Sequence, residues 1–239
     1  AIHNSDCIIM IGGRLDNQMN FGNPPFFPKH TDLICVNGSH EEIQFNMAAD
    51  YALLSDPNAF FKALLSRSKD LVSSEKENWL TVNKSKRVDW VNDHLENLKI
   101  STSQDKWPKD AIHPLQLSIS VQEAMSNGDH LVFDGGNTHF WSEIAVNIVG
   151  VKNNLSLGSV MHPGSYSLLG VGISFALSVK RLNPKDNVIL ITGDGAFLSG
   201  GLSIETAFQE ALPIIVVIDN NGGLDCISQQ QERLFTSGT

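Results

Sequence analysis

Residues 187–223 decide the fold, and they read NVILITGDGAFLSGGLSIETAFQEALPIIVVIDNNGG. Residues 187–192 form a short apolar run that ends in Gly193-Asp194-Gly195, a pattern typical of a buried parallel strand followed by a loop. Residues 214–218 form a second apolar run, which ends in Asp219-Asn220-Asn221. Between them, apolar residues recur with helical spacing at Ile204, Ala207, Phe208, Ala211 and Leu212. The stretch therefore predicts a strand, a helix and a second parallel strand.

The loops that follow these two strands carry residues suited to a ligand. In a right-handed unit both strands end at the same edge of the sheet, where ligands bind, so we expect Asp194 and Asn221 to lie close together. Gly193 and Gly195 allow the backbone to approach a ligand, and free amides at a helix N-terminus attract phosphate oxygens. A carboxylate, an amide oxygen and a nearby backbone carbonyl suit Mg²⁺ held together with phosphates. Gly-Asp-Gly alone is a common loop and Asn-Gly a common turn, so the prediction of a Mg²⁺-diphosphate site depends on their combination at this spacing.

The flanking parts of the C-terminal half continue the alternation of helices and strands. Residues 117–125 predict an amphipathic helix, and residues 130–134 predict a strand followed by the loop Gly135-Gly136-Asn137-Thr138. Residues 170–179 predict a helix of small residues that can pack closely. This half therefore reads as one α/β layer.

The N-terminal part has the same character. Apolar runs predict strands at residues 7–11, 33–36 and 51–54, and residues 41–46 predict a short helix. Asp56-Pro57 opens an amphipathic helix with Phe60, Phe61, Leu64 and Leu65 on one side. The sequence thus predicts a second α/β layer.

A polar segment with a helical stripe separates the two layers. Residues 71–112 are rich in Lys, Ser, Asp and Asn, and their apolar positions repeat at Val88, Val91, Leu95 and Leu98. We predict an α/β protein with two doubly wound parallel-sheet domains. Their boundaries are residues 1–70 for the first domain, 71–112 for a helical linker and 113–239 for the second domain.

Composition excludes several classes of protein. The chain has 239 residues, of which 41% are hydrophobic and 18% charged, which is enough apolar material for a buried core. The net charge of −9 argues against a nucleic-acid binder, although backbone amides and a metal ion can still hold an anionic cofactor. Three widely spaced cysteines without a CxxC favour a reducing cytosol, and no apolar run approaches the roughly 20 residues of a membrane span. The N-terminus has no basic region of a signal peptide, and it lacks Met, so we expect a piece of a longer polypeptide.

The segment from Gly193-Asp194-Gly195 to Asn220-Asn221 resembles the thiamine diphosphate (ThDP) motif of the acetolactate synthase and pyruvate decarboxylase superfamily. The resemblance implies that Asp194 and the Asn221 side chain bind Mg²⁺, that the Gly223 carbonyl is the third protein ligand, and that the metal holds both phosphates. It also implies a Rossmann-like middle domain, of which residues 1–70 are the C-terminal part, and a ThDP diphosphate-binding domain.

Two further segments resemble the family in the right order. Residues 134–138 resemble the loop that contacts the diphosphate from the neighbouring strand, and residues 164–172 resemble the segment under the cofactor. By this resemblance Leu169 lies between the two cofactor rings and enforces their bent conformation, while the Ser167 carbonyl and the Leu169 amide hold the aminopyrimidine; taken alone, Leu169 would read as a core leucine. The implied cofactor-binding set is Gly136, Asn137, Thr138, Ser167, Leu169, Gly193, Asp194, Gly195, Ala196, Asn221 and Gly223.

The N-terminal part indicates a branch of the superfamily. Gly12-Gly13-Arg14-Leu15-Asp16 and the NFGNPP sequence of residues 20–25 resemble the branch of 2-hydroxyacyl-CoA lyase, oxalyl-CoA decarboxylase and benzaldehyde lyase. Ser203 departs from the Glu of many relatives, and residues 229–233 are closer to the synthases. The resemblance implies carbon–carbon bond cleavage or ligation on a 2-oxo acid or 2-hydroxyacyl substrate, with acetolactate synthase activity as the alternative.

The family's activating Glu, which contacts the cofactor pyrimidine, lies in a separate N-terminal domain. The glutamates Glu42, Glu143, Glu205 and Glu210 stand in the wrong motifs to replace it. We therefore expect a pyrimidine-binding domain in cis or in trans, a homodimer or homotetramer in the cytoplasm, and neither nucleic acid nor membrane as partner. Other readings are a non-catalytic subunit that keeps the fold, and another nucleotide or phosphate binder, which the absence of GxGxxG and GxxxxGK[ST] disfavours. Of the histidines, His113, His139 and His162 either line the site or cap turns.

Overall fold

The computed structural model describes residues 2, 5–25, 27–28, 30–43, 45–46, 48–68, 76–103 and 110–235. The chain divides into two compact units, Ala1–Lys86 and Arg87–Thr239. Each unit contains its own parallel sheet, with three strands in the first and four in the second. The molecule is therefore an α/β protein with two parallel sheets, as the sequence predicts.

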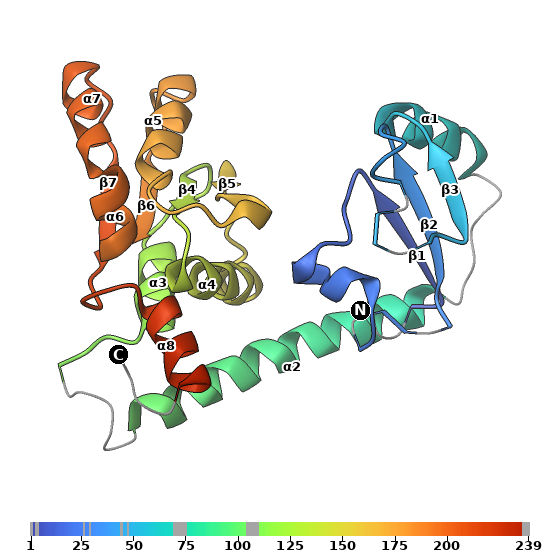
Figure 1. Ribbon diagram of the computed structural model, residues 1–239, viewed down its shortest axis with the longest axis horizontal. Helices are drawn as coiled ribbons and strands as arrows, with labels where there is room; N and C mark the ends of the chain where they lie inside the picture. Colours follow the sequence, from blue (N-terminus) through green and yellow to red (C-terminus); the bar gives the residue numbers. More distant parts are fainter. Residues whose placement is uncertain are drawn as a thin grey trace. The chain divides into compact units, whose positions relative to one another are not determined.

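The first unit is a parallel sheet in the order β1-β2-β3 with a small core (Figure 1). Its elements are β1 (Cys7–Ile11), the 3₁₀ segment η2 (Asn17–Gly22), β2 (Asp32–Asn37), β3 (Tyr51–Leu54) and α1 (Pro57–Arg67). Leu15, Phe27 and Leu33 are buried together at its centre. All three strands lie where the apolar runs predict them.

Two details of this unit bear on the predictions. Residues 41–43 and 45–46 form turns and bends instead of the predicted short helix, and here the Glu42 carboxylate pairs with Arg14. Asn46 has a positive φ of 69°, which a helix does not allow. Helix α1 begins as predicted, because the Asp56 carboxylate accepts from the amides of Asn58 and Ala59 at 2.9 and 3.1 Å.

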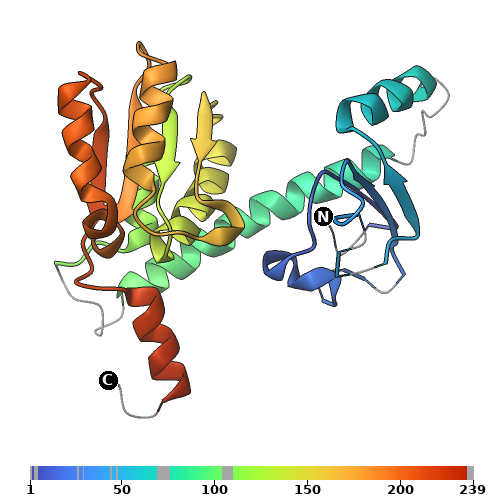
Figure 2. The ribbon, with the colours of Figure 1, turned by 45° about the horizontal axis from the view of Figure 1, so that its top comes forward.

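The second unit is a four-stranded parallel sheet with helices on both faces (Figure 2). Its strands are β4 (His130–Phe133), β5 (Ser159–Met161), β6 (Val188–Gly193) and β7 (Ile215–Asp219), in the spatial order β5-β4-β6-β7. Its helices are α3 (Pro114–Glu123), α4 (Asn137–Asn153), η4 (Gly164–Tyr166), α5 (Gly172–Leu182), α6 (Asp194–Gly200), η5 (Gly201–Ser203), α7 (Ile204–Gln209) and α8 (Asp225–Leu234). The two central strands, β4 and β6, are almost completely buried.

Alternation along the central strands gives each face of the sheet its own core. Val132 and Leu190 pack with α5 residues on one face, together with apolar residues near α7. Leu131, Phe133 and Ile191 point to the other face, where they pack with Met125 and with Val121 and Val146 of α3 and α4. The chain thus leaves β4 toward one face and β6 toward the other. The two loops diverge at the carboxyl edge between β4 and β6, which is where open α/β sheets bind ligands.

Several elements differ from the sequence predictions. Helix α3 begins at Pro114 and α5 at Gly172, each a few residues from the predicted start. The sequence indicated no element at α4, β5 or α8. Helix α4 follows directly on the glycine loop and has no side-chain cap, so the usual start pattern is absent.

The polar segment between the two layers contains the long helix α2 (Lys76–Ser103). Its stripe is partly confirmed, because Val91 is buried and packs with Leu95 and Leu98 against residues of α3 and α4. The predicted boundaries 1–70, 71–112 and 113–239 stay a prediction, since residues 71–75 and 104–109 lie outside the described residues. Neither α2 nor any other helix in the described ranges is long and apolar enough to cross a membrane.

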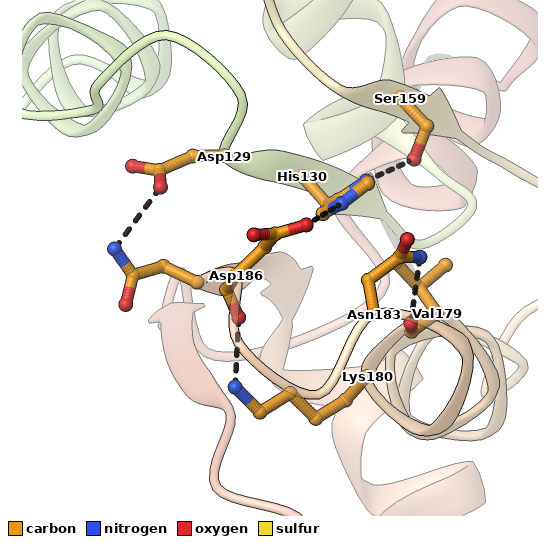
Figure 3. A network of polar contacts seen from close by, with 8 residues as sticks. Asp129, His130, Ser159, Val179, Lys180, Asn183 and Asp186 are labelled. Carbon is orange, nitrogen blue, oxygen red and sulfur yellow. Dashed lines mark hydrogen bonds and ion pairs between the residues drawn. The ribbon is translucent and has the colours of Figure 1, made fainter.

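A polar network closes the amino edge of the second sheet (Figure 3). His130 is only 6% exposed; its Nδ1 lies 2.8 Å from the Ser159 hydroxyl and its Nε2 3.3 Å from the Asp186 carboxylate. Buried Lys180 donates to the Asp186 carbonyl at 2.7 Å, and Asn187 donates to the Asp129 carboxylate at 3.0 Å. These contacts join the beginnings of β4, β5 and β6.

Candidate cofactor site

A pocket of about 280 Å³ opens at the carboxyl edge of the second sheet, between the loops that follow β4 and β6. All of the predicted cofactor residues line it: Gly136, Asn137, Thr138, Ser167, Leu169, Gly193, Asp194, Gly195, Ala196, Asn221 and Gly223. The structure therefore brings together residues from four separate segments of the chain. Their roles toward a cofactor stay a prediction.

The three predicted metal ligands converge on one point. The Asp194 carboxylate accepts from the Gly195 amide at 2.8 Å and from the Gly222 amide at 3.0 Å, which fixes its orientation. One terminal atom of the Asn221 amide lies 3.3 Å from Oδ1 of Asp194 and 2.8 Å from the Gly223 carbonyl oxygen, and hydrogen bonding assigns nitrogen to that position. The prediction that Asp194 and Asn221 meet at this edge is confirmed.

This donor set fits a divalent cation. A half-turn of the Asn221 amide would bring its oxygen beside the oxygens of Asp194 and Gly223, and such oxygen ligands suit Mg²⁺. Among the described residues that line the pocket there is no lysine or arginine. A bound diphosphate would therefore depend on backbone amides and a cation to balance its charge.

The N-terminus of α4 points its backbone at the same pocket. Gly136 precedes the helix with φ of 90° and ψ of −163°, a conformation that essentially only glycine adopts, and no side chain caps the helix. Asn137 and Thr138 are its first two residues, and both line the pocket. Uncapped amides at the start of a long helix favour a phosphate group.

Asp134 holds the pocket loops together, and sequence reasoning missed this role. Its carboxylate is 1% exposed and accepts from the amides of Gly135, Gly170 and Gly172 at 2.9, 3.0 and 3.0 Å. A Cβ at Gly135 would lie 2.7 Å from the Ser167 carbonyl oxygen, so only glycine allows the two loops to approach this closely. Asp134 thus ties the loop after β4 to the segment before α5.

The segment before α5 places Ser167 and Leu169 on the pocket wall. Ser167 adopts a left-handed conformation with φ of 47°, which glycine adopts more readily than serine. The Leu169 side chain is 37% exposed, and its Cδ2 lies 3.6 Å from the position that a Cβ on Gly136 would take. Leu169 is therefore a wall residue with free apolar surface and not the core leucine of the alternative reading.

A buried carboxylate lies behind the pocket. Asp219 is 9% exposed and accepts from the Thr138 hydroxyl at 3.4 Å. Burial raises the pKa of Asp219, and the carboxylates of Asp194 and Asp225 raise it further, while the Thr138 hydrogen bond lowers it. The carboxyl groups of Asp194, Asp219 and Asp225 thus lie near enough to influence one another beside the pocket.

The three candidate histidines do not line this pocket. His113 caps α3, since its Nδ1 accepts from the Leu115 amide at 3.1 Å, and it faces a neighbouring cavity of about 880 Å³ that shares Asn221 and Asp225 with the pocket. His139 and His162 lie against Glu143, with Nε2 to carboxylate distances of 3.1 and 3.9 Å. His162 Nδ1 accepts from the Gly164 amide, so its proton lies on Nε2 and faces Glu143. This protonation does not suit a metal bound at Nε2.

Besides Gly135 of the predicted glycine loop, five lining residues lie outside the predicted set: Phe140, Leu224, Asp225, Cys226 and Ile227. All but Phe140 belong to α8 or to the residue before it. The mixed polar and apolar spacing of residues 225–234 could have indicated this helix. None of the glutamates Glu42, Glu143, Glu205 and Glu210 lines the pocket.

Comparison with known families gives two matches. The family "thiamine pyrophosphate enzyme, C-terminal TPP binding domain" matches residues 135–239, which contain every predicted cofactor residue. The family "thiamine pyrophosphate enzyme, central domain" matches residues 1–64, the sheet of the first unit. The two matches occur in the order that the sequence resemblance implies.

Similar proteins include lyases and a synthase. Mouse 2-hydroxyacyl-CoA lyase 1 is 27% identical over 94% of this chain and 37% of its own length, and human 2-hydroxyacyl-CoA lyase 2 is 25% identical over 97% and 35%. The acetolactate synthase large subunit of Buchnera aphidicola is 22% identical over 99% of this chain and 38% of its own length. The chain thus spans less than two fifths of the length of these relatives. The paired domain matches and these relatives identify the chain as a member of the thiamine diphosphate-dependent enzyme superfamily.

Proposed function

We propose that this chain binds thiamine diphosphate by its diphosphate, together with Mg²⁺, and that it supplies the cofactor site of an enzyme that cleaves or forms carbon–carbon bonds. The observation that carries the proposal is the convergence of Asp194, Asn221 and Gly223 beside the uncapped N-terminus of α4. The substrate class is a 2-oxo acid or a 2-hydroxyacyl compound, and cytoplasmic location and a homo-oligomer belong to the same proposal.

The chain's own residues would bind and orient the cofactor. Asp194, Asn221 and the Gly223 carbonyl would hold the cation, and the amides of Asn137 and Thr138 would donate to phosphate oxygens. Leu169 would pack between the two rings, and the Ser167 carbonyl would accept from the aminopyrimidine. When bound, thiamine diphosphate supplies an electron sink for breaking a bond next to a carbonyl carbon. The protein contributes position and the exclusion of water.

The branch of the superfamily is the finer part of the proposal. Lyase activity on 2-hydroxyacyl-CoA is favoured, because relatives with that name align over 94% and 97% of the chain and because residues 20–25 resemble this branch. Acetolactate synthase activity is the alternative, supported by the synthase relative that aligns over 99% of the chain. The activating Glu is expected in a pyrimidine-binding domain, so catalysis would need that domain in cis or in trans.

Calorimetry on Asp194→Ala tests the proposal. Removing the charged ligand should weaken Mg²⁺-dependent binding of thiamine diphosphate by roughly 100-fold or more, while the circular dichroism spectrum stays unchanged. Glu205→Ala, an exposed carboxylate on α7, is the matched control and should bind as the wild type does. Undiminished affinity and Mg²⁺ dependence in Asp194→Ala would contradict the site assignment.

A mixing experiment tests the need for a second domain. The folded chain with Mg²⁺, thiamine diphosphate and a panel of 2-oxo acids and 2-hydroxyacyl thioesters should show no turnover. Adding the pyrimidine-binding domain of a related enzyme should produce it. Turnover by the chain alone would mean that a group within it performs the activation.

A further inference from the structure

The side chain of Asn137 is already occupied by another group of the protein. Its Nδ2 donates to Oδ2 of Asp225 at 2.6 Å, a short bond between the first residue of α4 and the first residue of α8. Gln229, one turn further along α8, donates to the same oxygen at 2.8 Å. Both partners of the short bond line the pocket. The side-chain amide of Asn137, one of the predicted cofactor-binding residues, is therefore bound to a carboxylate.

The Asp225 carboxylate and its acidic surroundings disfavour the binding of an anionic ligand. Asp194 lines the same pocket, Asp219 contacts the hydroxyl of the lining residue Thr138, and the part of the lining that the structure describes holds no lysine or arginine. A second carboxylate at the diphosphate end repels phosphate oxygens and is not needed for the convergence of Asp194, Asn221 and Gly223. Its two amide donors are the partners that an anion would seek in this place.

We propose that Asp225 caps the pocket from within. Its carboxylate holds the side-chain amide of Asn137, which could otherwise donate to a diphosphate beside the backbone amides of α4, and Asp225 so sets the affinity of the site for diphosphate ligands. This inference rests on the proposed function. When a diphosphate binds, Asn137 leaves Asp225 and donates to a phosphate oxygen, while Gln229 keeps the carboxylate hydrogen-bonded. Asp225 is thus a positioning residue that acts through Asn137.

A simpler role for Asp225 makes a different prediction. An acidic residue in the first turn stabilises a helix, so Asp225 could serve α8 alone. In that case its removal would loosen α8 and leave the affinity of the pocket unchanged or lower. The capping role requires the opposite sign, an increase in affinity.

Calorimetry with two probes, Mg²⁺-pyrophosphate and Mg²⁺-thiamine diphosphate, distinguishes these roles. Asp225→Ala, which removes the charge and the acceptor, should bind both probes about tenfold more tightly than the wild type. Asp225→Asn keeps the shape and should bind more tightly by a smaller factor. Glu232→Gln removes an exposed charge from the same helix and should leave both affinities unchanged.

A double-mutant cycle shows whether the effect passes through Asn137. Asn137→Ala should weaken the binding of both probes. In that background, Asp225→Ala removes only the charge repulsion, because the Asn137 side chain is no longer there to be released. The increase in affinity should therefore be smaller than in the wild-type background. An equal gain in both backgrounds would overturn the capping role, and so would unchanged or weaker binding in both Asp225 variants. If Asp225→Ala does not fold, Asp225→Asn and its own cycle with Asn137→Ala give the same decision.

The outcomes separate this inference from the proposed function. If the wild type binds both probes and the Asp225 variants bind them no more tightly, the capping role is wrong and the proposed function stands. If Asp194→Ala binds as the wild type does, the cation assignment is wrong, whatever the Asp225 variants show. If neither the wild type nor any Asp225 variant binds either probe, both proposals are overturned.

Discussion

The two edges of the second sheet differ in how completely their polar groups are paired. At the amino edge, His130 lies between Ser159 and Asp186, and Lys180 and Asn187 bind neighbouring acceptors. At the carboxyl edge, α4 begins without a cap, and the side chains of Asp194 and Asn221 converge with the Gly223 carbonyl. One edge is closed by the protein itself, and the other leaves groups that a ligand can complete.

Chain direction explains this difference. In a parallel sheet every strand ends at the same edge, so all of the loops that enter a following helix gather there. Gly136 after β4 and Gly193 at the end of β6 line the pocket, whereas the strands begin with residues that bind each other. Stability and ligand binding can therefore be changed separately by substitutions at opposite edges.

Asp134→Ala is expected to have the largest effect, because it should reduce both the stability of the fold and ligand binding at the carboxyl edge. The variant leaves the amides of Gly135, Gly170 and Gly172 without their acceptor. We expect a loss of about 3 kcal/mol in the free energy of unfolding and a loss of thiamine diphosphate binding. Urea denaturation and calorimetry measure the two quantities, and a variant that binds normally would show that Asp134 does not shape the pocket.

His130→Ala should lower the stability of the fold at the amino edge without changing ligand binding at the carboxyl edge. It removes the ring that joins β4 to Ser159 and Asp186, at a cost of about 2 kcal/mol in the free energy of unfolding. Because the network lies at the amino edge, the affinity for thiamine diphosphate should change by less than about twofold. Ser159→Ala is the milder control. A parallel fall in affinity at a temperature where the variant is folded would contradict the independence of the two edges.

Leu169→Ala should distinguish the part of the pocket that contacts the cofactor rings from the part that holds the diphosphate. Since the side chain is partly exposed, the free energy of unfolding should fall by less than about 1 kcal/mol. The affinity for thiamine diphosphate should fall about tenfold through lost ring contacts, while the affinity for pyrophosphate stays unchanged. Equal losses for both ligands would mean that Leu169 does not contact the rings. In the complete enzyme, turnover should fall more than affinity does.

The sequence predicted the parts of this edge that depend on local pattern. Apolar runs located β4, β6 and β7, and Gly193-Asp194-Gly195 with Asn220-Asn221 located the place where Asp194 and Asn221 meet. The roles of Asp134 and Asp225 were not predictable, because their partners lie far away in the chain. Residues 41–43 and 45–46 form turns and bends where a helix was predicted. Glu42 pairs there with Arg14, which is distant in the sequence, and Asn46 has a positive φ, and neither feature is visible in a local apolar pattern.

The smallest expected effect concerns His113, a buried histidine that caps α3 beside the carboxyl edge. His113 caps the helix through an unprotonated Nδ1, which accepts from the Leu115 amide at 3.1 Å. Burial lowers the pKa of His113 below its ordinary value of 6.5. As the pH falls below 6.5, the unfolded chain therefore takes up a proton that the folded chain does not, and stability decreases through this range.

His113→Asn should reduce this acid sensitivity, because Asn also caps helices but does not titrate. At about pH 8 the variant should be within about 1 kcal/mol of the wild type, the difference reflecting the lost contact with the Trp141 ring. Between about pH 8 and pH 5.5 its stability should fall less than that of the wild type. Part of the fall should remain, because burial also lowers the pKa of His162. Urea denaturation at both pH values measures the difference, with exposed His40→Asn as the control, and an unchanged pH dependence in His113→Asn would show that His113 is not the group that titrates.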